Sequence, residues 1–221
     1  MPIAAYTSSL ARNLTRRIFA SLPLVLFTTS GVIFINDNVV ETSWITGGSM
    51  SPTLSPGYET TRKRDLVLWN KWSANTARYE PGDVILFRSP HDPETVAVKR
   101  VIGTEGTSIT LDPRRRPSRR RDAADLPESR GWDAWGGRVP SVPEGHLWVE
   151  GDFWRRSRDS NWYGPISKSL VQGKAVVVVW PLSRFGTRPW EAGYTSKTKV
   201  KAGVIEKEED TAGLVRAIRH G

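Results

Sequence analysis

The sequence predicts a mainly β fold with one N-terminal transmembrane helix, and three observations support this prediction. Short runs of β-forming residues recur after turn residues, as at 66–69, 83–88 and 95–102. An uncharged stretch, residues 18–35, precedes all of them and is long enough to cross a membrane as a helix. The chain has 221 residues and is 38% hydrophobic, which is enough to bury the core of one domain with appendages.

The uncharged stretch follows a basic segment. Before residue 37 the chain contains arginines but no Asp or Glu. As a helix, residues 18–35 would span about 27 Å at ~1.5 Å per residue, close to the thickness of a bilayer core. A cleaved signal peptide is the alternative, although the stretch is long for one and no small-residue cleavage site follows it. We expect a basic segment at 1–17 and a single-pass anchor at 18–36, with the remaining chain across the membrane from the arginines.

The composition excludes several kinds of chemistry. The chain has no cysteine, which rules out disulfides, thiolate nucleophiles and cysteine-ligated zinc. With only three histidines, metal catalysis is not expected, and nothing in the sequence requires a cofactor. The net charge of +9 would suit an anionic membrane surface or a nucleic acid, but the excess is concentrated in a few stretches.

Residues 47–54 contain the candidate nucleophile, Ser49. Gly47 and Gly48 allow unusual backbone angles and a close backbone approach, while Pro52 fixes the exit of the bend. The Ser49 hydroxyl and amide would then be exposed on a constrained turn, as acyl transfer requires. A surface loop rich in Gly, Ser and Pro is the alternative reading, so a base elsewhere in the chain is needed to support catalysis.

Lys99 is the candidate base. It lies in the predicted strand 95–102, where period-two alternation puts it on one face with Ala97 and Val101. Apolar surroundings disfavour the ammonium form and lower a lysine pKa, which yields an amine able to accept a proton near neutral pH. An ordinary solvent-facing strand lysine is the alternative.

Residues 112–141 break the β pattern. Six arginines, at 114–116 and 119–121, are followed by a partly acidic stretch with Gly and Trp. We expect a largely disordered insert within the folded domain. Its arginines suit anionic lipid, whereas no recognisable nucleic-acid module accompanies them.

Regular structure is predicted again after the insert. Residues 145–152 predict a strand that ends in a turn, and residues 157–165 predict a polar loop. Residues 174–180 are apolar almost throughout, which predicts a central strand. The chain ends in a charged tail, 191–221, which could form a short amphipathic helix at 212–218 and for which we expect no catalytic role.

Three blocks in this order resemble the type I signal peptidase family, in particular its mitochondrial inner membrane members. Gly-Ser-Met-Ser-Pro-Thr-Leu at 48–54 is similar to the serine box of that family, and Val-Lys-Arg-Val-Ile-Gly at 98–103 to its lysine box. Gly-Asp and Ser-Arg-Asp-Ser within 151–160 are similar to a third box. The resemblance covers about residues 15–185 and implies an antiparallel β domain at 37–190 with an extended substrate groove.

The resemblance also implies roles for single residues. Ser49 would be the nucleophile and Lys99, kept neutral, its general base. The Ser157 hydroxyl would orient the lysine amine, while Asp159 and Ser160 would brace the loop that carries it.

At two positions the chain differs from the bacterial members of this family, which narrows the subgroup that it resembles. Bacterial members have a serine two positions before the nucleophile that helps to hold the oxyanion, whereas this chain has Gly47, as mitochondrial members do. The oxyanion would therefore depend on backbone amides beside Gly47 and Gly48, including that of Ser49. Asn161 stands where bacterial members and the first mitochondrial subunit usually have arginine, which is similar to the second subunit.

The function that this resemblance implies is removal of sorting presequences from precursors of intermembrane-space proteins. The enzyme would be a serine endopeptidase of the mitochondrial inner membrane, with its catalytic domain facing the intermembrane space. A paralogous protease subunit is the expected partner, and neither cofactor nor metal is implied.

Two other functions remain open from the sequence. A Ser-His-Asp hydrolase would use His146 or His91 as base, although no motif connects either residue to Ser49. A catalytically silent, membrane-anchored β domain would instead bind lipid, nucleic acid or a partner through the arginine-rich insert.

Overall fold

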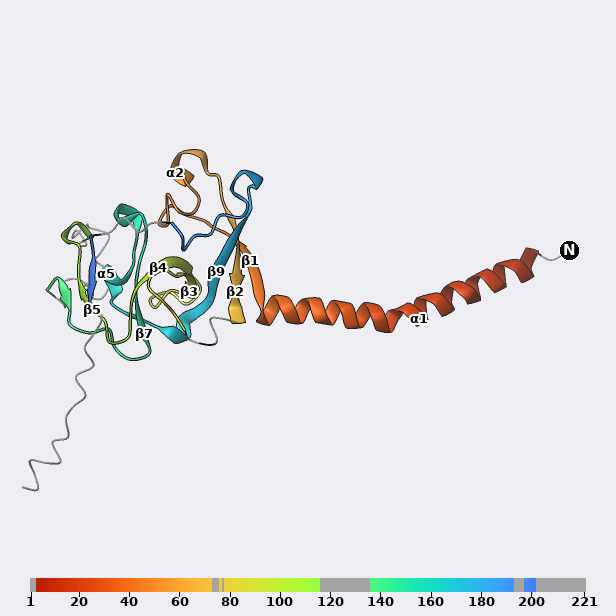
Figure 1. Cartoon of the computed structure of the whole chain (residues 1–221). Helices are drawn as coiled ribbons and strands as arrows, with labels where there is room; N and C mark the ends of the chain where they lie inside the picture. The colour runs from red at the N-terminus through yellow and green to blue at the C-terminus, as the bar shows by residue number, and fades with distance from the viewer. Residues whose placement is uncertain (1–2, 73–75, 77, 116–135, 193–196, 202–221) are drawn as a thin grey trace, which may run out of the picture.

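The computed structural model describes residues 3–72, 76, 78–115, 136–192 and 197–201. A long N-terminal helix, α1 (Ile3–Asn38), projects from a compact β domain (Figure 1). Its part Ala20–Asn38 is long and apolar enough to cross a membrane, and none of that part is buried in the protein. Because a run of exposed apolar side chains is unfavourable in water, the helix fits membrane anchoring, and the predicted N-terminal apolar helix is confirmed. Helix α1 begins earlier than the predicted anchor, within the segment 1–17 that was expected only to be basic.

The described part of the domain contains two antiparallel sheets, which confirms the predicted mainly β fold. The larger sheet has seven strands in the order β1-β2-β9-β3-β4-β7-β8. These strands are β1 (Val40–Trp44), β2 (Leu66–Asn70), β3 (Val84–Arg88), β4 (Val96–Thr104), β7 (His146–Glu150), β8 (Ile166–Ser167) and β9 (Val171–Trp180). Strand β9 lies between β2 and β3, so the strand predicted at 174–180 is indeed interior.

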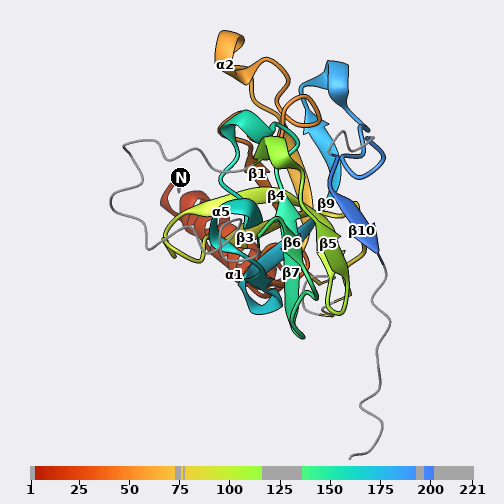
Figure 2. The same ribbon diagram turned by 90° about the vertical axis from the view of Figure 1, so that its left-hand side faces the viewer.

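The smaller sheet has three strands in the order β10-β5-β6 and lies beside β7 in Figure 2. Its strands are β5 (Ser108–Thr110), β6 (Arg138–Val139) and β10 (Lys199–Lys201). Short helices connect the strands: α2 (Tyr58–Thr61), η1 (Pro113–Arg115), η3 (Trp154–Arg156), α5 (Ser160–Tyr163), η4 (Lys168–Leu170) and η5 (Leu182–Arg184).

Both faces of the large sheet are covered, as the alternation along β3 shows. Val84 and Leu86 belong to one buried cluster, which also contains Met50 and Leu54 of the serine stretch. Ile85, the residue between them, belongs to a second cluster on the other face. A continuous apolar run is expected for such a strand because neither face meets water. The serine stretch is thereby attached to the core of the domain.

The two ends of the predicted insert differ from expectation, because they are part of the fold. Asp112 and Arg115 are buried, and Val139 is fully buried in strand β6. Arg115 can be buried because its guanidinium is paired with Glu150. The arginines at 116 and 119–121 lie outside the described residues, and Arg114 is exposed, so the expectation about anionic lipid now concerns these positions and not Arg115.

Part of the predicted C-terminal tail also belongs to the domain. Strand β10 pairs with β5, with Val200 opposite Ile109, and the Thr198 hydroxyl donates to the Glu150 carboxylate at 3.1 Å. The Lys-Val-Lys sequence of β10 gave little apolar signal because this short strand is exposed along its length. The helix predicted at 212–218 lies outside the described residues.

Candidate active site

The serine stretch forms a tight bend after strand β1. Gly47 has a φ of 98°, in the left-handed region that favours glycine. The Ser51 amide donates to the Gly48 carbonyl at 3.1 Å, and the Leu54 amide to the Met50 carbonyl at 2.9 Å. Because Met50 and Leu54 are buried in the core, the half-buried Ser49 between Gly48 and Met50 has a fixed position.

Lys99 lies on β4 and its side chain ends at Ser49. The lysine is only 5% exposed, and its Nζ donates to Ser49 Oγ at 2.9 Å and to the Val98 carbonyl at 2.9 Å. Burial lowers the pKa of Lys99 to about 8, against the opposing effect of the negative charges of Asp159 and Asp152. The fold therefore joins a serine hydroxyl to a buried amine that loses its proton much more readily than a solvated lysine does.

The turn after β7 closes against the serine bend. The Phe153 amide donates to the Ser49 carbonyl at 2.9 Å. A Cβ at Gly151 would lie 2.7 Å from the same carbonyl and would collide with the Ser157 side chain. Only glycine allows this close approach, which gives the Gly-Asp of the third block a physical reason.

Asp159 organises the loop that follows. Its carboxylate accepts from the Ser157 hydroxyl at 2.7 Å, from the Gly151 amide at 3.0 Å and from the Asn161 amide at 3.1 Å. As the residue before α5, it caps that helix, and the next residue, Ser160, accepts from the Val149 amide at 2.9 Å. The loop is thus fastened to strand β7 by both side chains.

Ser157 has a different partner from the one that the resemblance implied. Its hydroxyl donates to Asp159, whereas the Lys99 amine donates to Ser49 and to the Val98 carbonyl. Ser157 is buried beside Gly151. In this structure it therefore holds the Asp159 carboxylate, and the predicted contact with the lysine amine is not formed.

A buried ion pair that the sequence analysis did not identify ties the three blocks together. Arg100 donates to Asp152 through Nε at 2.9 Å and through Nη2 at 2.7 Å. The hydroxyl of Thr53, in the serine stretch, donates to the same carboxylate at 2.5 Å. Each of these residues lies within one of the three blocks, but only the fold brings them together.

The histidines do not meet the serine. His146 Nδ1 lies 2.8 Å from the Glu144 carbonyl oxygen, and the His91 ring packs edge-on against Tyr163 at 5.8 Å between centroids. Neither contacts Ser49 in the described part of the chain, so the Ser-His-Asp alternative gains no support. Among those residues there is also no cluster of three or more acidic or histidine side chains that could hold a metal ion.

The buried lysine has a consequence for stability. Because its pKa falls from 10.5 to about 8 on folding, the unfolded chain binds more protons between these values, and stability rises with pH through this window. We expect Lys99→Met to unfold at a higher temperature than the parent at pH 7, with a gain of about 1–3 kcal/mol. The gain should shrink as pH approaches 10.5. Thermal unfolding at both pH values checks this, and a less stable variant at pH 7 would contradict it.

The chain thus combines a β domain with a helix that is long and apolar enough to cross a membrane, and its fold brings a serine hydroxyl into contact with a buried lysine amine. Residues 15–180 match the family described as "Signal peptidase, peptidase S26", and the chain belongs to this family.

Named relatives specify the branch of the family. Mitochondrial inner membrane protease subunit 2 of Saccharomyces cerevisiae is 38% identical over 157 residues, which cover 71% of this chain and 77% of the relative. Mitochondrial inner membrane protease subunit 1 of Mus musculus is 34% identical over 140 residues, covering 63% of this chain and 69% of the relative. The chain is thus similar to both subunits of this mitochondrial protease.

A crystal structure of signal peptidase I from Enterococcus faecalis V583 is also similar. It is 22% identical, covers 45% of this chain and 97% of its own, and superposes with a TM-score of 0.32. The family assignment depends on the sequence matches and not on this weak superposition.

Proposed function

We propose that the chain is a membrane-anchored endopeptidase that removes sorting presequences, with Ser49 as nucleophile and Lys99 as general base. The observation that carries this proposal is the 2.9 Å contact between Lys99 Nζ and Ser49 Oγ, made by a buried amine. Membership of a peptidase family supports the same activity.

The chemistry follows from the protonation state of the lysine. With a pKa of about 8, roughly a tenth of Lys99 is neutral at pH 7. The neutral amine accepts the Ser49 proton, and the alkoxide attacks the scissile carbonyl carbon. The ammonium then protonates the leaving amine, and in the second half-reaction the amine activates the water that releases the acyl group from Ser49.

Backbone amides are the proposed oxyanion donors. Gly47 and Gly48 carry no side chain beside the nucleophile, and the bend fixes the direction of the Ser49 amide. A Cβ at Gly48 would lie 2.9 Å from Glu59 Oε1, so glycine lets the Glu59 side chain lie against the bend. Fixed amides are effective here because they need no reorientation as the negative charge develops.

The substrate is proposed to bind as an extended strand beside β4. From Arg100 onward β4 pairs with β7, but in the described sheet the stretch 96–99 pairs only with β3. The free edge of that stretch leads directly to Lys99, so a peptide that added to it would reach the serine. Small residues near the cleaved bond would suit such a confined approach.

The names of the relatives support a proposal about where the chain is located and which protein it assembles with. Those relatives are named as mitochondrial inner membrane proteases, and both kinds of subunit are among them. We propose that the basic segment at 1–17 remains in the matrix, that the β domain faces the intermembrane space, and that a paralogous subunit is the partner.

A cleavage assay with the purified full-length chain in detergent tests the proposal. The chain should cleave a presequence-bearing precursor into two products, alone or when combined with the paralogous subunit. The matched control is the same preparation with Ser49→Ala in this chain, which removes cleavage by this subunit but not by its partner. A precursor that this chain leaves uncut in both conditions would favour the catalytically silent β domain instead.

A further inference from the structure

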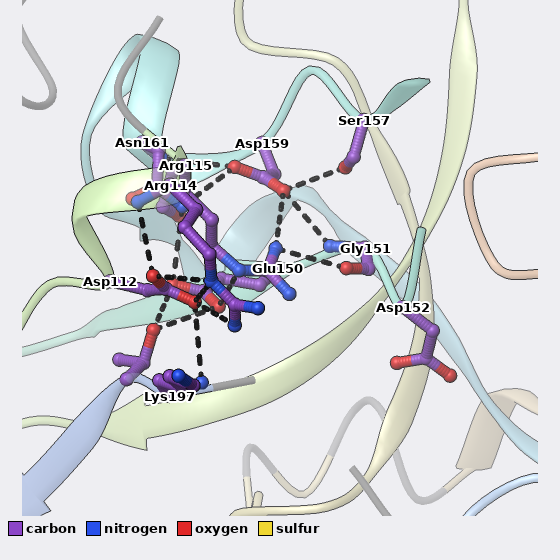
Figure 3. A network of polar contacts seen from close by, with 12 residues as sticks. Asp112, Arg114, Arg115, Glu150, Gly151, Asp152, Ser157, Asp159, Asn161 and Lys197 are labelled. Atoms are coloured by element: carbon purple, nitrogen blue, oxygen red, sulfur yellow. Dashed lines mark hydrogen bonds and ion pairs between the residues drawn. The ribbon is translucent and has the colours of Figure 1, made fainter. Parts of the chain in front are cut away.

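Arg115 occupies an unusual position at the start of the stretch that follows strand β5. Only 6% of the residue is exposed. Its Nε lies 3.1 Å from Glu150 Oε2, and its Nη1 lies 3.6 Å from Asp159 Oδ2. The same Nη1 donates to the Gly151 carbonyl at 3.0 Å. Figure 3 shows Arg115 among these three partners, which come from β7 and from the loop before α5.

The local sequence directs one arginine inward and its neighbour outward. The Arg115 amide donates to the Asp112 carbonyl at 2.9 Å, which closes the turn η1. Arg114 pairs with the Asp112 carboxylate at 2.6 Å and leaves 44% of its own side chain exposed. Adjacent arginines therefore have different environments, and only Arg115 reaches the third block.

Glu150 is the main counterion of Arg115 and is completely buried. It also accepts from the Trp148 indole at 3.2 Å, from the Asn161 amide group at 3.2 Å and from the Thr198 hydroxyl at 3.1 Å. A buried carboxylate with a cation and several donors is satisfied, whereas one without the cation would be costly.

Asp159 connects this network with the proposed catalytic pair. The oxygen that lies 3.6 Å from Arg115, Oδ2, also accepts from the Ser157 hydroxyl and from the Gly151 amide. Gly151 in turn packs against the Ser49 carbonyl. A change at Arg115 would therefore be transmitted to the serine bend through two fixed contacts.

The charges around Lys99 give a second argument. Two carboxylates favour its ammonium form, Asp159 and Asp152. Each is next to a buried guanidinium: Arg100 pairs with Asp152, and Arg115 lies beside Asp159. Each cation offsets the negative charge that its carboxylate presents to the amine.

Two charged side chains on other neighbouring elements have partners of their own. On β9, Lys174 pairs with Asp83 at 2.7 Å, and on η3, Arg156 pairs with Glu59 at 2.6 Å. Asp159 and Asp152 are the two charged groups that raise the pKa of Lys99, and Arg115 and Arg100 are the guanidiniums beside them.

We propose that Arg115 is a positioning residue of the active site, whose guanidinium holds Asp159 and the Gly151 carbonyl and offsets the charge that Asp159 presents to Lys99. The proposal rests on the roles proposed for Ser49 and Lys99. Under this proposal, the beginning of the predicted insert at 112–141 contributes a residue to the active site.

Two variants and a neighbouring control test the proposal in the full-length protein. Arg115→Met removes the guanidinium that pairs with the buried Glu150, so we expect it to lose stability for that reason alone. The double variant Arg115→Gln with Glu150→Gln removes both charges, and the proposal predicts that it folds. Arg114→Met is the control, because it removes the neighbouring arginine, whose side chain is exposed.

Two measurements are made on each folded variant. The first is the pH dependence of Lys99 acetylation by trace acetic anhydride, read by mass spectrometry, which reports the lysine pKa without any need for catalysis. The second is the pH profile of kcat/KM for a presequence peptide. If the lysine pKa and the kcat/KM profile disagree in the parent, the proposed function fails, while the labelling result for Arg115 still stands.

We expect the double variant to raise the Lys99 pKa by about 0.5–1 unit, because Asp159 is no longer offset. At pH 7, kcat/KM should then be about three- to tenfold lower than in the parent. At pH values above the shifted limb, it should return to within about twofold of the parent value. Arg114→Met should match the parent in both measurements. A double variant that does not fold, or that folds with the lysine pKa of the parent and a loss of rate equal at every pH, would overturn the proposal.

Discussion

We expect Ser49→Ala and Lys99→Met each to lose precursor cleavage, with kcat/KM lowered by about 10⁴-fold or more. The first variant removes the attacking oxygen, and the second removes the amine that lies 2.9 Å from it. Because the two groups act as one unit, the double variant should be no worse than either single variant. The measurement is kcat/KM for a presequence peptide, determined for the two single variants and the double variant in the same detergent.

The matched controls are Ser169→Ala and Lys168→Met, which change the same residue types on η4. Lys168 forms an ion pair with Glu105 and has no contact with the proposed site. Both controls should retain the rate of the parent. Residual cleavage above about 1% in either dyad variant would remove that residue from the mechanism.

The second large effect concerns the pair between Arg100 and Asp152. We expect Asp152→Ala to lower the free energy of unfolding by about 3–5 kcal/mol, because Arg100 stays buried without its counterion. The change also removes the acceptor of the Thr53 hydroxyl, which holds the serine stretch. For a domain of this size, the melting temperature should fall by about 6–20 °C.

An exposed pair provides the comparison for this prediction. Arg188 and Glu191 are 3.0 Å apart, and each side chain is 59% exposed. Glu191→Ala should change the unfolding midpoint little, because water and salt already screen such a pair. Equal effects of Asp152→Ala and Glu191→Ala would mean that the buried pair contributes no more than a surface contact.

Local patterns were sufficient for the main parts of the fold, and they marked Ser49 and Lys99 as candidates for the site. The uncharged N-terminal stretch predicted the apolar part of helix α1 but not its start at Ile3, and apolar runs between turn residues predicted strands β2, β3, β4 and β9. The glycines beside Ser49 and the apolar neighbours of Lys99 are local signals too. Their contact, across 50 residues of sequence, required the motif order in addition to pattern.

The remaining parts of the site depend on tertiary contacts and leave no local signal. Arg115 stands among other arginines in a stretch that looks disordered, yet it is buried because Glu150 and Asp159 meet it from distant segments. Strand β10 is too short and too polar to be identified before β5 is in place beside it. The composition of a segment predicts how exposed its residues are on average. Whether one charged residue is buried depends on the residues that pair with it in the fold.

The pH profile of kcat/KM tests the central claim most directly, because it reports the pKa of the group that must lose its proton in the free enzyme. Since Lys99 has a pKa of about 8, the rate should rise with pH through a single limb near pH 8 and level off above it. The limb should be unchanged in His146→Ala and His91→Ala, because neither histidine contacts Ser49. A limb near pH 6.5 that disappears in either histidine variant would contradict a lysine base.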